Sequence, residues 1–251
     1  MSLPFDQAGE GAAVVLLHAG VADRRMWSEH LEPLSQAGYR AVAVDLPGFG
    51  EAPMGALSPW DAVLAMMDEL EIARAALVGN SFGGGMALRA AAIAPERVVA
   101  LVLVSARPFD APPSAQLAAA WEAEEAALER GDVAAATEAV VEAWTQPDAP
   151  PTLRDEVAAM QRRAFALQLD VHETDVADPL TGPDDLAAIT IPTLVAAGEH
   201  DMPDFLEAAA ELERTLPDTE RVTIARAGHL APLETPKAFL EVLTDFLARR
   251  A

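Results

Sequence analysis

The chain has 251 residues, 51% of them hydrophobic and none of them cysteine, which suits one large domain and excludes both wholesale disorder and any role for disulfides or a thiol nucleophile. Its 17 basic and 40 acidic side chains leave a net charge of −23, and this argues against nucleic acid or an anionic membrane as a partner, because both carry negative charge. No unbroken apolar run approaches the roughly eighteen residues that a membrane-spanning helix needs.

Six short apolar runs alternate with helix-length segments along the chain. Most of the runs are continuously apolar, as is typical of parallel strands that are covered on both faces. The predicted strands are residues 13–18, 41–45, 75–80, 98–105, 193–198 and 221–225, and the predicted helices between them are residues 25–37, 59–70, 82–94, 203–216 and 236–249. This alternation predicts an α/β fold with a doubly wound, mostly parallel sheet.

One stretch interrupts the alternation, because no convincing strand lies between about residues 109 and 186. Three helices are predicted there instead, over residues 115–130, 133–145 and 153–169. The segment 107–186 contains 5 basic and 17 acidic side chains, so it carries about half of the net charge. We therefore predict a core formed by residues 1–106 and 187–251, with residues 107–186 inserted as a helical cap.

The strongest local motif is G-x-S-x-G at Gly79, Ser81 and Gly83, directly after a predicted strand and at the start of a predicted helix. A serine on such a sharp strand-to-helix turn projects its hydroxyl above the sheet edge, and its neighbours two residues away must be small. The positive end of the helix dipole favours an oxyanion that develops there. This context predicts that Ser81 is a nucleophile rather than part of a glycine-rich helix start that only packs.

A serine nucleophile needs a histidine base, which a carboxylate in turn orients. His229 and Asp201 each follow a predicted strand, and the carboxyl ends of strands are where the sites of open α/β sheets gather. The chain order of Ser81, Asp201 and His229 is one that catalytic triads use. We predict this triad, with Glu199 and Asp204 as competing acids.

The tetrahedral intermediate of acyl transfer needs N–H donors for its oxyanion. One donor is expected from Phe82, the residue after the nucleophile. The other is expected from Gly20, in the loop after the first parallel strand. We interpret His18 in the same loop as a hydrogen-bonding brace rather than a proton-transfer group.

These motifs resemble those of the α/β-hydrolase superfamily over essentially the whole chain. The resemblance is strongest to the lidded branch that contains esterases, enol-lactonases, cofactor-free haloperoxidase-type enzymes and carbon–carbon bond hydrolases. It implies that the loop 45–50 is structural and that the inserted helices form a lid over the site. The matching segments are LLHAG (16–20), DLPGFG (45–50), GNSFGG (79–84), GEHD (198–201) and AGHLAPLE (227–234).

The sequence departs from the family pattern in two places. The usual His-Gly of the oxyanion loop is His18-Ala19, which leaves Gly20 in place as a donor. Only about a dozen residues precede the first parallel strand, so the usual leading antiparallel hairpin is expected to be short or partly missing.

Ser81 also separates the chain from the haloalkane dehalogenases and epoxide hydrolases that it resembles, because those carry an aspartate nucleophile there.

The sequence predicts a metal-free serine hydrolase that cleaves a small ester, thioester or lactone through an acyl-enzyme on Ser81. No paired carboxylates at metal-ligand spacing and no dinucleotide fingerprint occur, so we assign no metal and no cofactor. One alternative is carbon–carbon hydrolysis of a vinylogous diketone, with Arg107, Arg162 and Arg163 available for a dicarboxylate. The other alternative is a non-catalytic, hydrolase-like binding protein.

The cap aromatics Trp121, Trp144 and Phe165 lie in predicted helices, and at least one is expected to line the substrate pocket. The substrate is expected to be a small molecule, neutral and partly apolar, because the acidic surface disfavours anions. We expect no nucleic-acid or membrane partner, and a monomer or a homodimer. Because Asp6 and Glu10 fall where a secretory signal would have its apolar run, we expect a cytoplasmic protein.

Overall fold

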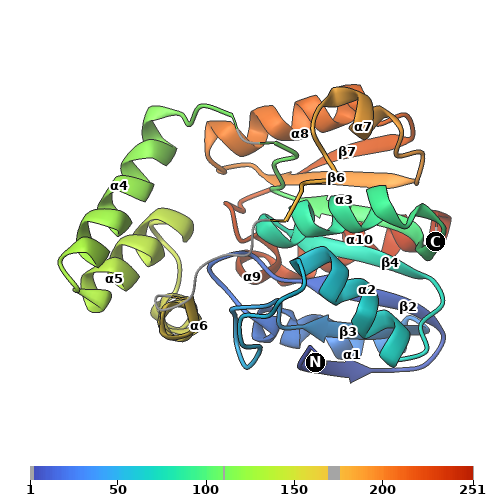
Figure 1. Ribbon diagram of the computed structural model, residues 1–251, viewed down its shortest axis with the longest axis horizontal. Coiled ribbons are helices and arrows are strands. Elements are labelled where there is room, and N and C mark those ends of the chain that lie inside the picture. The colour runs from blue at the N-terminus through green and yellow to red at the C-terminus, as the bar shows by residue number, and fades with distance from the viewer. Residues whose placement is uncertain (1–2, 110, 169–175, 251) are drawn as a thin grey trace.

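The chain folds into a central sheet with helices on both faces and a helical insert beside it (Figure 1). The computed structural model describes residues 3–109, 111–168 and 176–250. The strands are β1 (Phe5–Ala8), β2 (Ala12–Leu17), β3 (Tyr39–Val44), β4 (Ala75–Asn80), β5 (Val98–Val104), β6 (Thr193–Gly198) and β7 (Thr219–Ile224). The helices are α1 (Ser28–Gln36), α2 (Pro59–Glu69), α3 (Phe82–Ile93), α4 (Ala115–Glu129), α5 (Val133–Trp144), α6 (Pro151–Gln168), α7 (Pro183–Ala187), α8 (Pro203–Thr215), α9 (Ala231–Glu234) and α10 (Pro236–Arg250).

The strands form one seven-stranded sheet in the order β1-β3-β2-β4-β5-β6-β7. β1 runs antiparallel to β3, and the other neighbouring pairs are parallel. This topology confirms the predicted doubly wound, mostly parallel sheet. β1 is not among the predicted strands, because only Phe5 and Ala8 of its four residues turn inward while Asp6 and Gln7 stay exposed.

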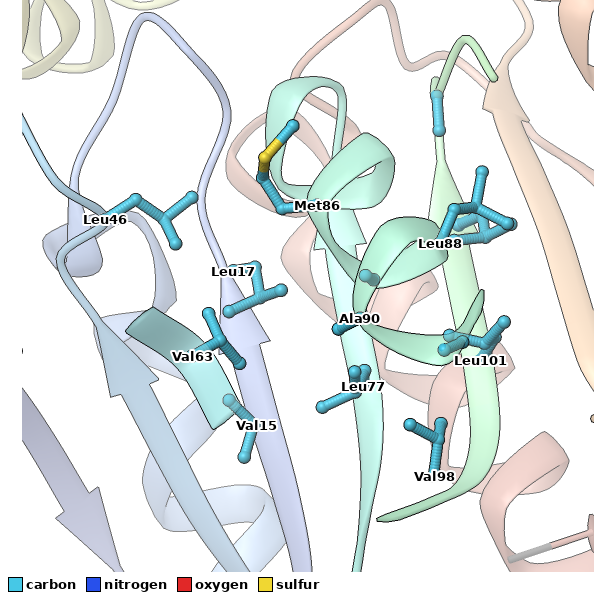
Figure 2. Close-up of a cluster of buried hydrophobic side chains, with 14 of the residues drawn as sticks. Val15, Leu17, Leu46, Val63, Leu77, Met86, Leu88, Ala90, Val98 and Leu101 are labelled. Carbon is cyan, nitrogen blue, oxygen red and sulfur yellow. The ribbon is translucent and has the colours of Figure 1, made fainter. Parts of the chain in front are cut away.

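Two apolar layers cover the sheet, one on each face. Val15 and Leu17 of β2 belong to the layer beneath α2, α3 and α8, whereas Val14 and Leu16 belong to the opposite layer beneath α1 and α10. Figure 2 shows part of the first layer, in which side chains of β2, β4 and β5 face those of α2 and α3. Burying residues of this size contributes roughly 1.5–3 kcal/mol each, so strands that are apolar on both faces are held firmly at the centre.

The insert consists of α4, α5 and α6, which lie between β5 and β6 in the sequence and beside the sheet in Figure 1. It joins the core through an apolar cluster that includes Trp144 and Phe165 from the insert and Met202 and Phe205 from the core. α7 packs against α8 of the core. The boundaries at 107 and 186 stay a prediction, and residue 169 of the predicted third helix lies outside the described residues. In the described part of the chain, no helix combines the length and apolar character needed to cross a membrane.

Candidate active site

Ser81 lies on a sharp turn between β4 and α3. Its φ of 53° is in a region that residues other than glycine rarely adopt, at a cost of about 1–3 kcal/mol. The turn is crowded, because a Cβ on Gly79 would lie 2.3 Å from the carbonyl carbon of Gly83, and a Cβ on Gly83 would lie 2.4 Å from the carbonyl oxygen of Leu17. The small residues of the G-x-S-x-G motif therefore permit the strained turn that exposes Ser81 at the sheet edge.

His229 and Asp201 form a buried pair. Nδ1 of His229 lies 3.0 Å from Oδ1 of Asp201, and the two residues are only 5% and 7% exposed. The same Asp201 oxygen accepts a hydrogen bond from the backbone N–H of Met202 at 2.8 Å. Because a carboxylate oxygen only accepts, Nδ1 carries the proton and Nε2 is left as the acceptor for a substrate or nucleophile.

The two competing acids make other contacts. Glu199 accepts a hydrogen bond from the backbone N–H of Arg226 at 2.9 Å. Asp204 accepts from the backbone N–H of Ser114 at 2.7 Å and from its hydroxyl at 2.5 Å, which lowers the pKa of Asp204 against the opposing effect of its own burial. The geometry thus brings Asp201, and neither rival, to the histidine.

Asn80 links the serine turn to the histidine loop. Its fully buried side-chain amide donates to the carbonyl of His229 at 3.1 Å and to the carbonyl of Val104 at 3.2 Å. The hydroxyl of Ser81 itself makes no hydrogen bond to the described residues. In unliganded sites catalytic contacts are often long and tighten only when substrate binds. The hydrogen bond from Asn80, which directly precedes Ser81, connects the serine turn to the loop that carries His229.

The two predicted oxyanion donors lie side by side. A Cβ on Gly20 would come within 3.4 Å of the Cβ of Phe82. Phe82 is the first residue of α3, so its N–H has no acceptor within the helix, and among the described residues the N–H of Gly20 likewise makes no backbone hydrogen bond outside helices and strands. Both N–H groups are therefore available to an oxyanion beside Ser81.

His18 braces the loop that carries Gly20. Its Nε2 accepts a hydrogen bond from the backbone N–H of Leu46 at 2.9 Å, and its Nδ1 donates to the carbonyl of Ala19 at 2.8 Å. The side chain is fully buried, and this burial lowers the pKa of His18. A neutral imidazole with both nitrogens occupied fits the predicted bracing role.

Glu234 ties the histidine loop to the insert. Its carboxylate accepts hydrogen bonds from the backbone N–H of Gly228 at 2.5 Å and of Gln146, just after α5, at 3.0 Å. Burial raises the pKa of Glu234, and these two N–H groups oppose the rise. The position of α5 is thereby coupled to the loop that carries His229.

The predicted cap aromatics occupy three different environments. Trp144 is 8% exposed and its ring centroid lies 4.5 Å from that of His229. Phe165 is buried in the same apolar cluster. Trp121 is 43% exposed, on the outside of α4. A core residue without a predicted role, Phe205, lies 4.2 Å from the His229 ring.

A cavity of about 450 Å³ opens beside Phe82. Much of its wall comes from the loop between β3 and α2 and from the start of α3, rather than from the cap aromatics. The position of this loop depends on Asp45, which accepts hydrogen bonds from the backbone N–H groups of Arg24 and Glu51 at 2.8 Å each. The apolar wall residues include Phe49, Met54, Leu57, Trp60, Phe82 and Met86.

Sequence reasoning missed three features of this site: Asn80 as a link, Phe205 beside the imidazole, and the cavity wall around Trp60. The sequence carries a signal only for the first, because an asparagine at the end of a fully buried strand needs hydrogen-bond partners.

Within the described residues, no group of three or more histidine, aspartate or glutamate side chains is placed to hold a metal ion.

The chain is similar to known hydrolases over nearly its whole length. A 2-hydroxy-6-oxo-2,4-heptadienoate hydrolase from Pseudomonas putida is 31% identical over 258 residues, which cover 96% of this chain and 90% of the relative. A thermophilic esterase from Thermogutta terrifontis is similar in structure, with a TM-score of 0.80, 26% identity, and coverage of 98% of this chain and 93% of that one. The enol-lactonase from Burkholderia xenovorans also has a TM-score of 0.80, with 25% identity and coverage of 98% and 96%. Residues 14–242 match the Alpha/beta hydrolase family, and the chain belongs to that family.

Proposed function

We propose that the protein is a serine hydrolase that cleaves a small, neutral ester, thioester or lactone through an acyl-enzyme on Ser81. The observation that carries the proposal is the buried hydrogen bond of 3.0 Å between His229 and Asp201, in a loop that Asn80 holds to the serine turn. An imidazole oriented by a carboxylate beside a strained serine is the arrangement that activates a hydroxyl nucleophile.

Acylation begins when Oγ of Ser81 attacks the substrate carbonyl carbon while Nε2 of His229 accepts the hydroxyl proton. Asp201 keeps the imidazole in the required tautomer and stabilises the imidazolium that forms. The N–H groups of Gly20 and Phe82 donate to the oxyanion of the tetrahedral intermediate. The bond to the leaving group then breaks, and His229 gives its proton to the departing alcohol, thiol or lactone oxygen.

Deacylation repeats these steps with water. His229 accepts a proton from the water as it attacks the acyl carbon, and the same two N–H groups hold the second oxyanion. The bond to Oγ breaks, Ser81 recovers its proton from His229, and the carboxylic acid leaves. No step uses a metal or a cofactor.

The insert acts as a lid in this proposal, over residues 107–186. Its α5 places Trp144 next to His229, and Glu234 ties the end of α5 to the histidine loop. A lid in this position admits substrate when it opens and excludes water when it closes.

The second candidate is hydrolysis of a carbon–carbon bond in a vinylogous diketone, which the likeness to the Pseudomonas putida hydrolase favours. A dicarboxylate substrate would require cationic side chains at the pocket. Arg107 donates to the carbonyl of Ala111 at 2.9 Å and Arg163 donates to the carbonyl of Gly50 at 2.8 Å, and no arginine or lysine is among the described residues that line the cavity. These contacts support an ester or lactone over a dicarboxylate.

A fluorophosphonate probe tests the nucleophile. We expect it to label the parent protein and not Ser81→Ala, which removes one hydroxyl from a turn that already requires small residues. Labelling that persists in Ser81→Ala would assign the nucleophile elsewhere.

A substrate panel tests the reaction class. p-Nitrophenyl esters, a lactone and a 2-hydroxy-6-oxo-dienoate are compared by kcat/KM, with EDTA expected to leave turnover unchanged. Faster cleavage of the dienoate than of any ester or lactone would favour the carbon–carbon hydrolase. Stoichiometric labelling of Ser81 without turnover of any compound would favour a binding protein.

A further inference from the structure

The space around the proposed triad is unequal on its two sides. On the Phe82 side lies the cavity of about 450 Å³. Phe82 directly follows Ser81, and its ring lies 5.6 Å from that of Phe49 across the cavity wall. This volume has room for about fifteen water-sized groups.

On the His229 side the space is filled. The rings of Trp144 and Phe205 lie 4.5 Å and 4.2 Å from the imidazole and 5.8 Å from each other. Both side chains are buried, at 8% and 5% exposure. Interiors packed in this way contain few voids larger than a water molecule, so a bulky substrate group does not fit there without displacing them.

The chemistry assigns the two sides to the two halves of the substrate. His229 must donate its proton to the leaving oxygen or sulfur, so the leaving group has to lie next to the imidazole. The oxyanion points to the N–H groups of Gly20 and Phe82. The acyl chain therefore extends away from His229, and the open space available to it is the cavity beside Phe82.

The cavity wall offers an acyl chain apolar contacts and no unpaired charge. The hydroxyl of Ser58 donates to Asp61 at 2.6 Å, and the amide of Gln168 donates to the carbonyl of Gly48 at 3.0 Å. The guanidinium of Arg89 lies 5.8 Å from the centroid of the Trp60 ring, and its Nε donates to Asp178 at 3.1 Å. A carboxylate at the far end of the acyl chain would find no free cation among the described residues that line the cavity.

We propose that the enzyme selects for the acyl half of its substrate: a neutral, linear acyl chain binds in the cavity against Leu57, Trp60 and Met86, while the leaving group is small. This inference rests on the proposed function, because it takes Ser81 as the attacking atom and His229 as the proton donor. It adds the direction in which the substrate lies and the residues that set its length.

Two ester series test the inference. With a fixed p-nitrophenol leaving group, kcat/KM should rise by up to about fourfold per added methylene, the value expected for full burial of each one, as the acyl chain grows from acetyl to octanoyl. With a fixed acetyl group, kcat/KM should stay level or fall as the alcohol grows from ethanol to octanol. The reverse pattern, with gain only on the alcohol side, would overturn the inference.

A matched pair of variants identifies the wall. Leu57 lines the cavity at 49% exposure, and Ile93 lies outside it at the end of α3 at 44% exposure. Leu57→Asp should lower the octanoyl-to-acetyl ratio of kcat/KM at least tenfold, whereas Ile93→Asp should leave the ratio as in the parent. Equal ratios in the two variants would overturn the assignment of the cavity, even if fluorophosphonate labelling of Ser81 upholds the proposed function.

Binding of an alkyl chain to the cavity can be measured even if the parent protein turns over no ester. Calorimetric titration with hexanamide and octanamide measures affinity for an alkyl chain without any reaction. We expect octanamide to bind more tightly than hexanamide to the parent and to Ile93→Asp, and the gain to vanish in Leu57→Asp. Affinity that is independent of chain length, or equally strong in Leu57→Asp, would contradict an acyl site in this cavity.

Discussion

The side-chain amide of Asn80 donates a hydrogen bond to the carbonyl of His229 at 3.1 Å, across 149 residues of sequence. Asn80 immediately precedes Ser81, and its own position is fixed by β4, whose residues are all buried. The rigid strand that presents the serine thus also holds the backbone of the histidine loop. Asn80 acts as a positioning residue in this arrangement, because its contact is to the carbonyl of His229 and not to the reacting atoms.

Asn80→Ala should therefore impair turnover as well as stability. It removes the hydrogen bond to the buried carbonyl of His229, at a cost of about 1–3 kcal/mol in the free energy of unfolding, whereas the carbonyl of Val104 keeps its hydrogen bond from the backbone N–H of Ser81. Displacement of the histidine loop by about 1 Å should lower kcat by about 100-fold with a smaller change in KM. Steady-state kinetics and urea unfolding measure the two effects.

The control for Asn80→Ala is Thr193→Val at the opposite end of the sheet. Thr193 is fully buried, and its hydroxyl donates to the carbonyl of Ile191 at 2.8 Å. This variant should lose stability without the fall in kcat. Equal kcat in the two variants would show that Asn80 serves the fold alone.

The choice of acid leads to a second prediction. Asp201→Asn should keep the shape of the site but favour the wrong tautomer of His229, with a loss of about 10⁴ in kcat if the triad works as in serine proteases. Glu199→Gln should have little effect, because Glu199 contacts the backbone of Arg226 on an exposed surface. Near-parent turnover in Asp201→Asn combined with inactivity of Glu199→Gln would mean that the acid is Glu199.

The parts of the fold that could be predicted from sequence are those with a continuous local pattern. β4 and β6 are buried throughout and apolar except for Asn80 and Thr193 at their ends, and the G-x-S-x-G motif marks the end of one strand and the start of one helix. β1 and α9 have no such pattern, because β1 is half polar and α9 is only four residues long. Arg24–Trp27 forms a 3₁₀ turn before α1, which a helical periodicity does not distinguish from the helix itself.

The triad could be predicted from the order of the strands alone, because Ser81, Asp201 and His229 each follow the end of a predicted strand. The residues that line the cavity could not be predicted, because tertiary contacts position them and no local sequence pattern reveals those contacts. The loop between β3 and α2, which carries Phe49 and Leu57 of the cavity wall, is placed by Asp45 and its partners. Trp121 and Trp144 both lie in predicted helices, although one is exposed and the other lies against His229.

His30 provides a prediction for stability against pH. The imidazole is 1% exposed and makes edge-to-face contacts with Trp27 and Phe239, and burial lowers the pKa of His30 to about 4 from the ordinary value of 6.5. Between these two values the unfolded chain binds a proton that the folded chain does not. The free energy of unfolding should therefore fall as the pH drops from about 6.5 towards 4, by up to about 3 kcal/mol from this group.

His30→Phe should remove this contribution while keeping an aromatic ring at the position. Urea unfolding between about pH 7 and pH 4.5 should show a shallower loss of stability in the variant than in the parent. His18, whose pKa burial also lowers, is present in both proteins, so its contribution cancels in the comparison. Parallel pH profiles for the two proteins would contradict a neutral, buried His30.

The last prediction compares two tryptophans of the insert. Trp144 is 8% exposed and packs with Phe205 and His229, whereas Trp121 is 43% exposed. Trp144→Ala should lower the free energy of unfolding by about 3–5 kcal/mol, the usual cost of deleting a large buried side chain. Trp121→Ala should change it by less than about 1 kcal/mol.

Trp144→Ala should also open space beside the imidazole, so acetate esters of larger alcohols should gain in kcat/KM relative to ethyl acetate. Trp144→Phe keeps most of the bulk and should retain the preference of the parent for a small leaving group, which separates loss of volume from loss of the indole. These kinetics are measured below the unfolding temperature of the least stable variant. Equal loss of stability in Trp144→Ala and Trp121→Ala, together with the same leaving-group preference in both, would contradict the prediction. It would mean that Trp144 does not pack against His229 in solution and does not limit the size of the leaving group.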